Sequence, residues 1–579
     1  MTVDKEKLLI EWKRKIKLGI LYQSQYGHSS KWPVFERYFE GNWGRGVLPV
    51  NLIFAFGKSL LPHVYNRNPH ATLTSKKPGR MLQTKATAGV LNWLIYETKV
   101  KKQIKRQAQD SYLYGTGVGK VGYDSEYGYD TSKVAPVIPG QGTLTGFGKE
   151  EQNIEYRVNV KPGMPWYLRT RTRDFVTPYG YLDIETMPWT AERIMRPLED
   201  VMADTKYKNK DTLRGKKTFN EHKMSQQKMK GGKQIETEGS VPDKMWEKLC
   251  EEEDWVEIWE IRDLRTRKVY AITMDHDKFL REDVDNLQVE GIPYESLIFN
   301  DSGFGFWGIS DCQIIEPQQL EMNEVRTQAQ AHRRVALIKA MGKRGVLKPE
   351  EIAKFLSGEV MPYIQVDTQD DIRTAITMLQ PHVPPDFAIL TQQIMEDVMQ
   401  MLGSSRNQRG DFNTGRRTAT EAQIVNVASQ IRLNERRDAT ADLFTSICRK
   451  YLQYIFTFWR DSSKVIDIIG ADGARYWVQY TGEAIKGEYD IQVNPDDSLP
   501  ITQETRKAEA KELYQITAQD PSVNRVEMTR QLLSQYEWLD PELLLAPRPG
   551  FGNNPEQAMP IDALQRALMG GTHNAQLPS

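Results

Sequence analysis

The chain has 579 residues, 39% of them hydrophobic and 27% charged, and it is too long for one hydrophobic core, so about three or four folding units are expected. Its 77 basic and 77 acidic residues cancel, whereas a protein that grips DNA through its phosphates normally has a basic excess. The balance argues against a repressor or a histone-like packing protein. It leaves open a protein that DNA slides past, because many phosphate contacts would act as a brake.

The cysteine pattern and the apolar runs indicate in which cellular compartment the protein is made. Cys250, Cys312 and Cys448 are far apart and form no CxxC pair, which predicts synthesis in a reducing cytoplasm. Residues 1–19 alternate charged and apolar residues at helical spacing, unlike a secretory leader. The most apolar early run, 50–65, is too short and too interrupted to span a bilayer, so no membrane insertion is expected.

The first third of the chain carries helical and then strand-like patterns. Apolar residues recur at helical spacing over 4–20, over 51–62 and over 83–115, where Gly115 has the C-cap position of one long helix. From 117 to 190 apolar and polar residues alternate around Gly and Pro. This alternation predicts antiparallel strands.

A further helix is predicted over AERIMRPLEDVMAD, residues 191–204, and a basic stretch follows at 206–233. Basic stretches occur in nucleic-acid-binding segments, but this one has no ladder of aromatic residues for base stacking. A solvated surface segment is therefore the favoured interpretation. Residues 254–299 alternate again and predict a meander of strands.

The middle of the chain returns to helical patterns. Ser310 is placed to cap a helix over 310–334, which Pro317 either bends or begins. A small mixed insert follows at 335–383. Within it the patterns predict a helix at 348–358 and a strand at 361–366.

A second helix is predicted after Pro384 and Pro385, and Gly403 ends it. One side of this helix is apolar, which indicates packing in the core or between subunits and no ligand site. The apolar stripe consists of Phe387, Leu390, Ile394, Val398 and Met401.

The segment GSSRNQRGDFNTGRRTATE, residues 403–421, has three glycines and four arginines, with a single acid before Glu421. This composition predicts a flexible cationic loop. Thr418 and Glu421 have the spacing of a capping box, and an apolar stripe then continues to Trp459, which predicts about 40 residues or roughly 60 Å of helix. A helix of this length in a chain without repeats is typical of one that crosses a domain or lines an assembly. We expect a kink near its charged RLNERRD patch.

The C-terminal part is predicted to contain strands at 464–480 and 487–496, then helices from 499 to about 545. The tail from 547 onward has the pattern of one short helix and otherwise the composition of a poorly ordered segment.

Motifs of phosphate-binding and metal-binding enzymes are incomplete. Gly117, Gly119 and Gly122 fit GxGxxG, but a dinucleotide site needs a helix after this turn, and here a helix precedes it and a strand continues. The sequence GKS at 57–59 lacks the first glycine of a phosphate loop and lies in a helical run. His276 has no second ligand cluster and fits a turn at a strand end. No enzyme activity, cofactor or metal is expected.

Four segments, in this order along the chain, resemble the portal protein of tailed double-stranded DNA bacteriophages, also called the head-tail connector. They are DSYLYGTGVGKVGYD (110–124), RDFVTPYGYLDIETMPWTAERIMRPLEDV (173–201), FGFWGISDCQIIEPQQLEMNEV (304–325, with Pro317, Gln318 and Asn323) and RTATEAQIVNVASQIRL (417–433, with Arg432).

The resemblance implies an α+β subunit of several domains that assembles as a ring, in the virion a dodecamer. The implied parts are 1–309, N-terminal helices and a strand-rich wing; 310–334, first stem helix; 335–383, clip; 384–402, second stem helix; 403–417, tunnel loop; 418–461, long wing helix; 462–499, wing strands; and 500–579, crown and flexible C-terminal tail.

The resemblance also implies a channel at one capsid vertex through which DNA is packaged and ejected. Such a protein is assembled in the cytoplasm of the bacterial host and becomes part of the virion. Its implied partners are double-stranded DNA without sequence preference, the large subunit of terminase, head-completion adaptor and tail proteins, and capsid and scaffold proteins.

Two sets of site residues follow from the resemblance. In the tunnel loop, arginines would touch phosphates without reading bases, weakly enough for DNA to slide; alternatively, they pair with acids of neighbouring subunits such as Glu396, Asp397 or Glu421. In the clip, basic residues would meet acidic surface of the motor or adaptor, or they are solvated turn charges. The tunnel-loop residues are Arg406, Asn407, Gln408, Arg409, Arg416 and Arg417, and the clip residues are Lys343, Arg344 and Lys348.

Two other classes remain as alternatives. A DNA-packaging ATPase or nuclease subunit would need an intact phosphate loop and carboxylates clustered after strands, and neither pattern is present. A structural adaptor without a channel is the second alternative.

Overall fold

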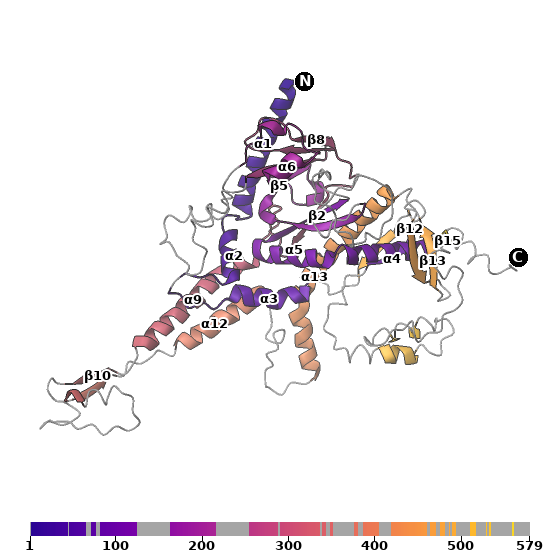
Figure 1. Ribbon diagram of the computed structural model, residues 1–579. Coiled ribbons are helices and arrows are strands. Elements are labelled where there is room, and N and C mark those ends of the chain that lie inside the picture. Colours follow the sequence, from indigo (N-terminus) through magenta and orange to yellow (C-terminus); the bar gives the residue numbers. More distant parts are fainter. Residues whose placement is uncertain are drawn as a thin grey trace.

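The computed structural model describes most of the first 459 residues and shorter pieces beyond them (Figure 1). The described residues are 2–44, 46–64, 71–76, 81–123, 163–215, 254–287, 290–335, 339–342, 348–350, 376–379, 386–403, 419–459, 464–469, 475–480, 486, 489–493, 510–516, 528–529, 532–533 and 559–560.

Helices and strands are mixed within this part of the chain, which is compatible with the predicted α+β class. The helices are α1 (Thr2–Tyr26), α2 (Trp32–Glu40), α3 (Leu52–Val64), α4 (Met81–Glu97), α5 (Val100–Tyr114), α6 (Leu198–Ala203), α9 (Asp311–Val335), α12 (Asp386–Leu402) and α13 (Ala419–Phe458).

Two antiparallel sheets form the body of the molecule. The first has the order β3 (Pro165–Thr170), β2 (Thr116–Tyr123), β9 (Tyr294–Ile298). The second has the order β4 (Phe175–Val176), β5 (Trp189–Pro197), β6 (Trp255–Asp263), β7 (Lys268–Ile272), β8 (Arg281–Val284). The strands predicted over 117–190 and 254–299 are thus confirmed where they are described.

Three small sheets lie outside the body. They are β1 (Ala71–Ser75) with β14 (Tyr489–Val493); β10 (Lys339–Gly342) with β11 (Ile376–Leu379); and β12 (Lys464–Ile469), β13 (Arg475–Tyr480) and β15 (Met559–Pro560). The strands of 462–499 therefore exist: β12 pairs with β13, β13 with β15, and β14 with β1. Among the described residues, none of the three pairs with a strand of the body sheets.

The five-stranded sheet is covered on both faces. Leu9, Trp12 and Ile16 of α1 repeat at helical spacing and bury themselves on one face, where the Trp12 and Trp189 rings meet edge to face at 5.7 Å. Val201 of α6 packs with strand residues in a separate buried cluster. The helix predicted at 4–20 is confirmed and runs on to Tyr26.

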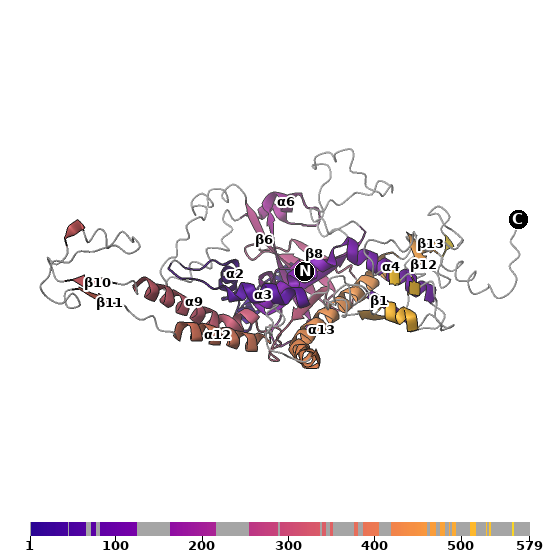
Figure 2. The same cartoon turned by 90° about the horizontal axis from the view of Figure 1, so that it is seen from below.

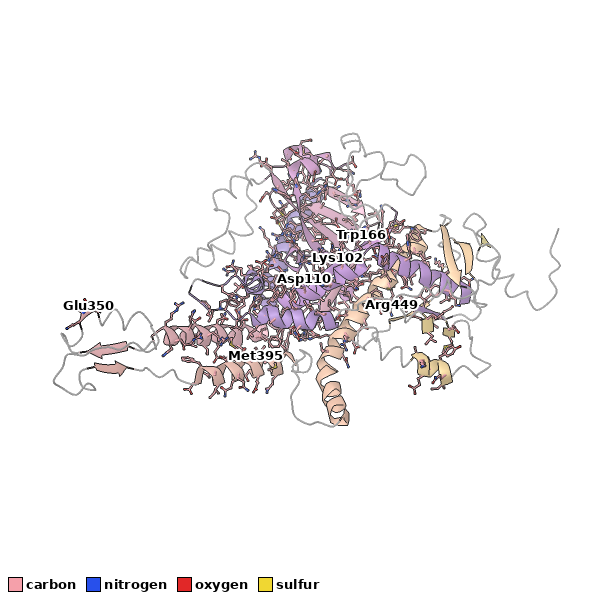
Figure 3. All side chains as sticks on the ribbon, turned by 60° about the horizontal axis from the view of Figure 1, so that its bottom comes forward. Lys102, Asp110, Trp166, Glu350, Met395 and Arg449 are labelled. Atoms are coloured by element: carbon pink, nitrogen blue, oxygen red, sulfur yellow. The ribbon has the colours of Figure 1, made fainter. Side chains whose placement is uncertain are left out.

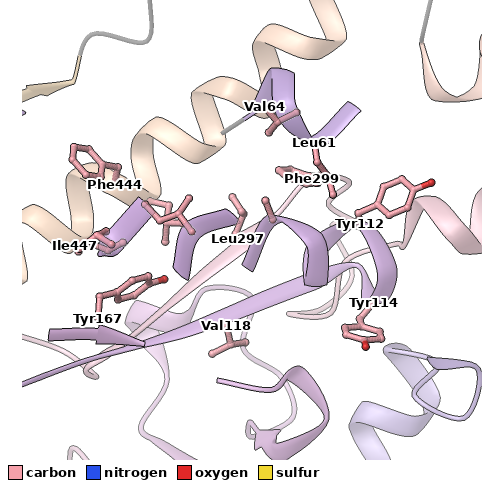
Figure 4. Close-up of a cluster of buried hydrophobic side chains, with 14 of the residues drawn as sticks. Leu61, Val64, Tyr112, Tyr114, Val118, Tyr167, Leu297, Phe299, Phe444 and Ile447 are labelled. Atoms are coloured by element: carbon pink, nitrogen blue, oxygen red, sulfur yellow. The ribbon is translucent and has the colours of Figure 1, made fainter. Parts of the chain in front are cut away.

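The glycines of the GxGxxG lookalike serve packing. They lie inside β2, and the strand continues after them to Tyr123. A Cβ on Gly117 would strike the Gln107 carbonyl of α5, and a Cβ on Gly119 would strike the Tyr167 hydroxyl. Because these glycines have no side chains, α5 and the aromatic residues of β3 can lie directly on the strand. Figure 4 shows part of the resulting core, where α3, α5 and α13 meet this sheet.

The single helix predicted over 83–115 is wrong. The structure has two helices, because Lys99 adopts a left-handed conformation (φ 53°) between them. Thr98 donates to the Leu94 carbonyl at 2.7 Å and lies 3.1 Å from the Tyr451 hydroxyl of α13. Gly115, also left-handed at φ 86°, ends α5 as predicted.

The helix predicted over 191–204 is wrong for its first half. Trp189–Pro197 is strand β5, which pairs with β6 along nine residues, and only Leu198–Ala203 is helical. Ala191, Glu192 and Arg193 are residues that tolerate helix, but the strand pairing outweighs that preference.

The two stem-like helices leave the body together. Figures 1 and 2 both show α9 and α12 side by side, with β10 and β11 beyond their outer end. Pro317 lies inside α9, which begins at Asp311, so it does not set the start of the helix. Figure 1 also shows α13 changing direction along its length.

Candidate functional site

Helices α9 and α12 together are called the arm. The candidate site consists of the base of the arm and the connection from α12 to α13. Ser310 caps the first helix: its hydroxyl accepts from the Gln313 amide at 3.2 Å and donates to the Leu113 carbonyl at 2.8 Å. The predicted cap is confirmed. The second bond also ties the start of α9 to the last turn of α5.

Asp311, the first residue of α9, joins the arm to the long helix. Arg436 of α13 donates to it at 2.8 and 2.9 Å in a two-pronged pair, and both side chains are buried. Asn300 donates to the same carboxylate at 3.1 Å. The acid also stands at the positive end of the α9 dipole. A buried charge pair with this geometry fixes the two helices in one relative position.

A row of polar residues on α9 holds the start of α3. Gln319 accepts from the Leu52 and Ile53 amides at 2.7 and 3.2 Å, and Asn323 accepts from the Val50 amide at 2.9 Å. The first amides of any helix lack partners within that helix. Here side chains of α9 accept hydrogen bonds from the backbone amides at the start of α3. α9 is therefore fixed to α3 as well as to α13.

α12 packs on α9 through part of its apolar stripe. Ile394 and Val398 are buried, as predicted for core packing, whereas Leu390 is exposed. Near the outer end, the rings of Phe387 and His332 meet at 5.2 Å. α12 ends at Gly403, whose φ of 64° is the left-handed conformation expected of a C-cap glycine.

The segment 404–418 therefore starts from a helix that packs on α9 and ends in a helix whose Arg436 is bonded to α9. α12 and α13 are thus both attached to α9. The tunnel-loop residues themselves, Arg406, Asn407, Gln408, Arg409, Arg416 and Arg417, lie outside the described residues.

Of the three residues predicted to dock a partner, the structure describes one. Lys343 and Arg344 follow β10 directly but are outside the described residues, whereas Lys348 is described and exposed. Glu350, two residues further on, lies beyond the outer end of the arm, close to β10 and β11 (Figure 3). The helix predicted at 348–358 is described only at Pro349 and Glu350, and the strand predicted at 361–366 falls outside the described residues.

The buried charges between the two body sheets form a closed network. Lys120 of β2 lies 3.1 Å from Glu192 and 3.0 Å from Glu260, and Glu260 lies 3.1 Å from Arg262. Burial alone would raise the pKa of Glu260, but Lys120 and Arg262 outweigh it and hold that pKa well below its usual range. Charges satisfied by one another in this way join the sheets and offer no free group for catalysis.

His276 lies in the connection from β7 to β8, as predicted. Burial lowers its pKa. Among the described residues no group of three or more His, Cys, Asp or Glu side chains is placed to hold a metal ion.

Sequence reasoning missed the residues that build the arm's base. Gln319, Asn323 and Thr327 recur every four residues beside buried Ile315 and Met322. A polar row at this spacing on an apolar helix is a signal for buried hydrogen bonding. The Asp311–Arg436 pair has no local signal, because its partners are 125 residues apart.

Comparisons of the sequence with protein-family models and with curated proteins find no match. In the part of the chain that is described, no helix combines the length and apolar character needed to cross a bilayer.

Proposed function

We propose that the protein is a phage portal protein, the subunit of a ring at a capsid vertex through which DNA is packaged and ejected. The observation that carries the proposal is the arrangement around α9. An antiparallel helical arm, with a small sheet beyond its outer end, shares its base with a long helix, and a glycine- and arginine-rich connection runs between arm and long helix.

In this proposal α9 and α12 are the stem, and the region of β10 and β11 is the clip that docks the terminase motor and later the adaptor. The body sheets with α13 are the wing, the segment 403–417 is the tunnel loop, and 500–579 is the crown. The arginines of the tunnel loop would touch passing phosphates, and Lys343, Arg344 and Lys348 would meet acidic surface on the docked partner.

In a ring, weak contacts between the loop arginines and DNA phosphates can guide the DNA without holding it. Each copy would add only a few phosphate contacts, which salt screens and which carry no base information. The chain as a whole has no net charge, which keeps total affinity for DNA low, so that DNA moves through without being held.

Electron microscopy of the purified protein tests the proposal. The expected result is closed rings with a central hole in negative stain. Monomers or open filaments at assembly concentrations would overturn it. ATP hydrolysis by the purified protein, without rings, would instead favour the packaging ATPase.

A further inference from the structure

Two exposed helix faces carry matched sets of opposite charge. On the first, Lys99, Lys102 and Arg106 occupy the start of α5 and its first turns; these three residues are called the basic triad. On the second, Glu435, Asp438 and Asp442 lie on α13 and are called the acidic triad. The spacing is the same in both sets, three residues and then four.

Neither set is neutralised by the residues that the structure describes. All six side chains are exposed, and none makes a side-chain hydrogen bond or ion pair with any described residue.

Each face costs stability in the isolated chain. Like charges at helical spacing repel one another, which applies to Lys102 and Arg106 within α5 and to the acidic triad within α13. The basic triad stands in addition at the N-terminal end of α5, where the helix dipole disfavours positive charge. An oppositely charged surface at the same spacing would relieve both costs.

We propose that the basic triad of one copy docks on the acidic triad of a second copy, with further copies added in the same way. A ring follows when each copy uses its basic triad toward one neighbour and its acidic triad toward the other, because such head-to-tail contacts close when the rotation allows. This inference rests on the proposed ring and names the surfaces that join its subunits.

The charge balance decides between a second copy and nucleic acid as the occupant. A surface built for phosphates needs no acidic counterpart, whereas this chain carries one at equal spacing and has zero net charge. Trp93 and Tyr96, 45% and 82% exposed, lie in the last turns of α4 just before the basic triad. Tryptophan, tyrosine and arginine are the residues most enriched at the centres of protein interfaces.

Charge reversal tests the contact. The first variant carries Lys99→Glu, Lys102→Glu and Arg106→Glu; the second carries Glu435→Lys, Asp438→Lys and Asp442→Lys; the third carries all six changes. A control variant carries Lys7→Glu, Arg14→Glu and Lys17→Glu, which reverse three exposed charges on α1. Assembly is measured by sedimentation velocity and negative-stain microscopy, and folding by circular dichroism.

The expected result is loss of rings in the first and second variants, with folded subunits, and rings in the third variant and the control. Rings in either of the first two variants would overturn the inference, as would loss of rings in the third variant or the control. If the first variant forms rings but retains less DNA, the basic triad binds nucleic acid instead. If the unmodified protein forms no rings, the proposed function itself fails, and the two failures are thereby distinguished.

Discussion

Asp311 and Arg436 form a buried two-pronged ion pair that joins the first residue of the arm to the middle of the longest helix. The guanidinium also lies 5.4 Å from the centre of the Phe299 ring. The Asp311 carboxylate accepts two hydrogen bonds from Arg436 and a third from Asn300. The pair therefore sets how α9 and α13, and the segment between α12 and α13, are placed relative to one another.

Asp311→Asn is expected to destabilise the fold by about 3–5 kcal/mol, because it leaves the Arg436 charge buried without its counter-charge. The shift in the midpoint of urea denaturation measures this. Arg449→Gln, which changes an exposed arginine of the same helix, is the control and should stay within about 0.5 kcal/mol of the unmodified protein. Equal midpoints for the two variants would refute the structural role of the pair.

Gln319→Ala is expected to cost about 1–3 kcal/mol, because the Leu52 and Ile53 amides at the start of α3 lose their buried acceptor. Gln328→Ala removes an exposed glutamine of α9 and should leave the denaturation midpoint nearly unchanged. Hydrogen exchange locates the effect: amides at the start of α3 should exchange faster in the first variant only. Uniformly faster exchange across the body would argue against a local effect on the start of α3.

The elements that local pattern alone specifies were predictable from the sequence. The helical stripe before Gly403 and the one that ends at Trp459 each continue for several turns and have a clear boundary, and α12 and α13 match them. Ser310 likewise had the local chemistry of a cap and is one.

Elements decided by distant contacts were not predictable. At the break between α4 and α5, Thr98 contacts Tyr451, 353 residues away. Strand β5 contains Ala191, Glu192 and Arg193, whose local preference is not for strand, and its conformation comes from pairing with β6. Asp311 has an ordinary local role as an acid in a first helical turn, so nothing in its neighbourhood points to Arg436.

Glu260 makes stability depend on pH. Its pKa is depressed in the folded state by Lys120 and Arg262, so its contribution is full above the unfolded pKa of about 4.3 and declines as pH falls below about 5. Glu260→Gln removes this contribution at all pH values. The difference in unfolding free energy between the two proteins should therefore shrink from pH 7 to pH 4, by about 0.7 kcal/mol for an unfolded pKa of about 4.3.

Denaturation midpoints at the two pH values measure the change. Glu257→Gln, on the same strand β6 and partly exposed, is the control and should show a smaller dependence. A difference for Glu260→Gln that stays constant or grows as pH falls would mean that the folded protein does not hold this carboxylate ionised.

Arg406→Ala combined with Arg409→Ala tests the loop between α12 and α13 in the proposed channel. Rings are expected to remain intact, because the flanking helices are fixed through α9 and the changed residues belong to neither. DNA packaging or retention should fall, because each ring loses two positive charges per subunit from its bore. The genome content of particles and the infectious titre measure this, with Arg14→Ala combined with Lys17→Ala on α1 as the matched loss of charge. Failure of the double variant to form rings would assign the arginines to contacts between subunits. Full-length genomes with normal titre would show that the arginines do not act on DNA.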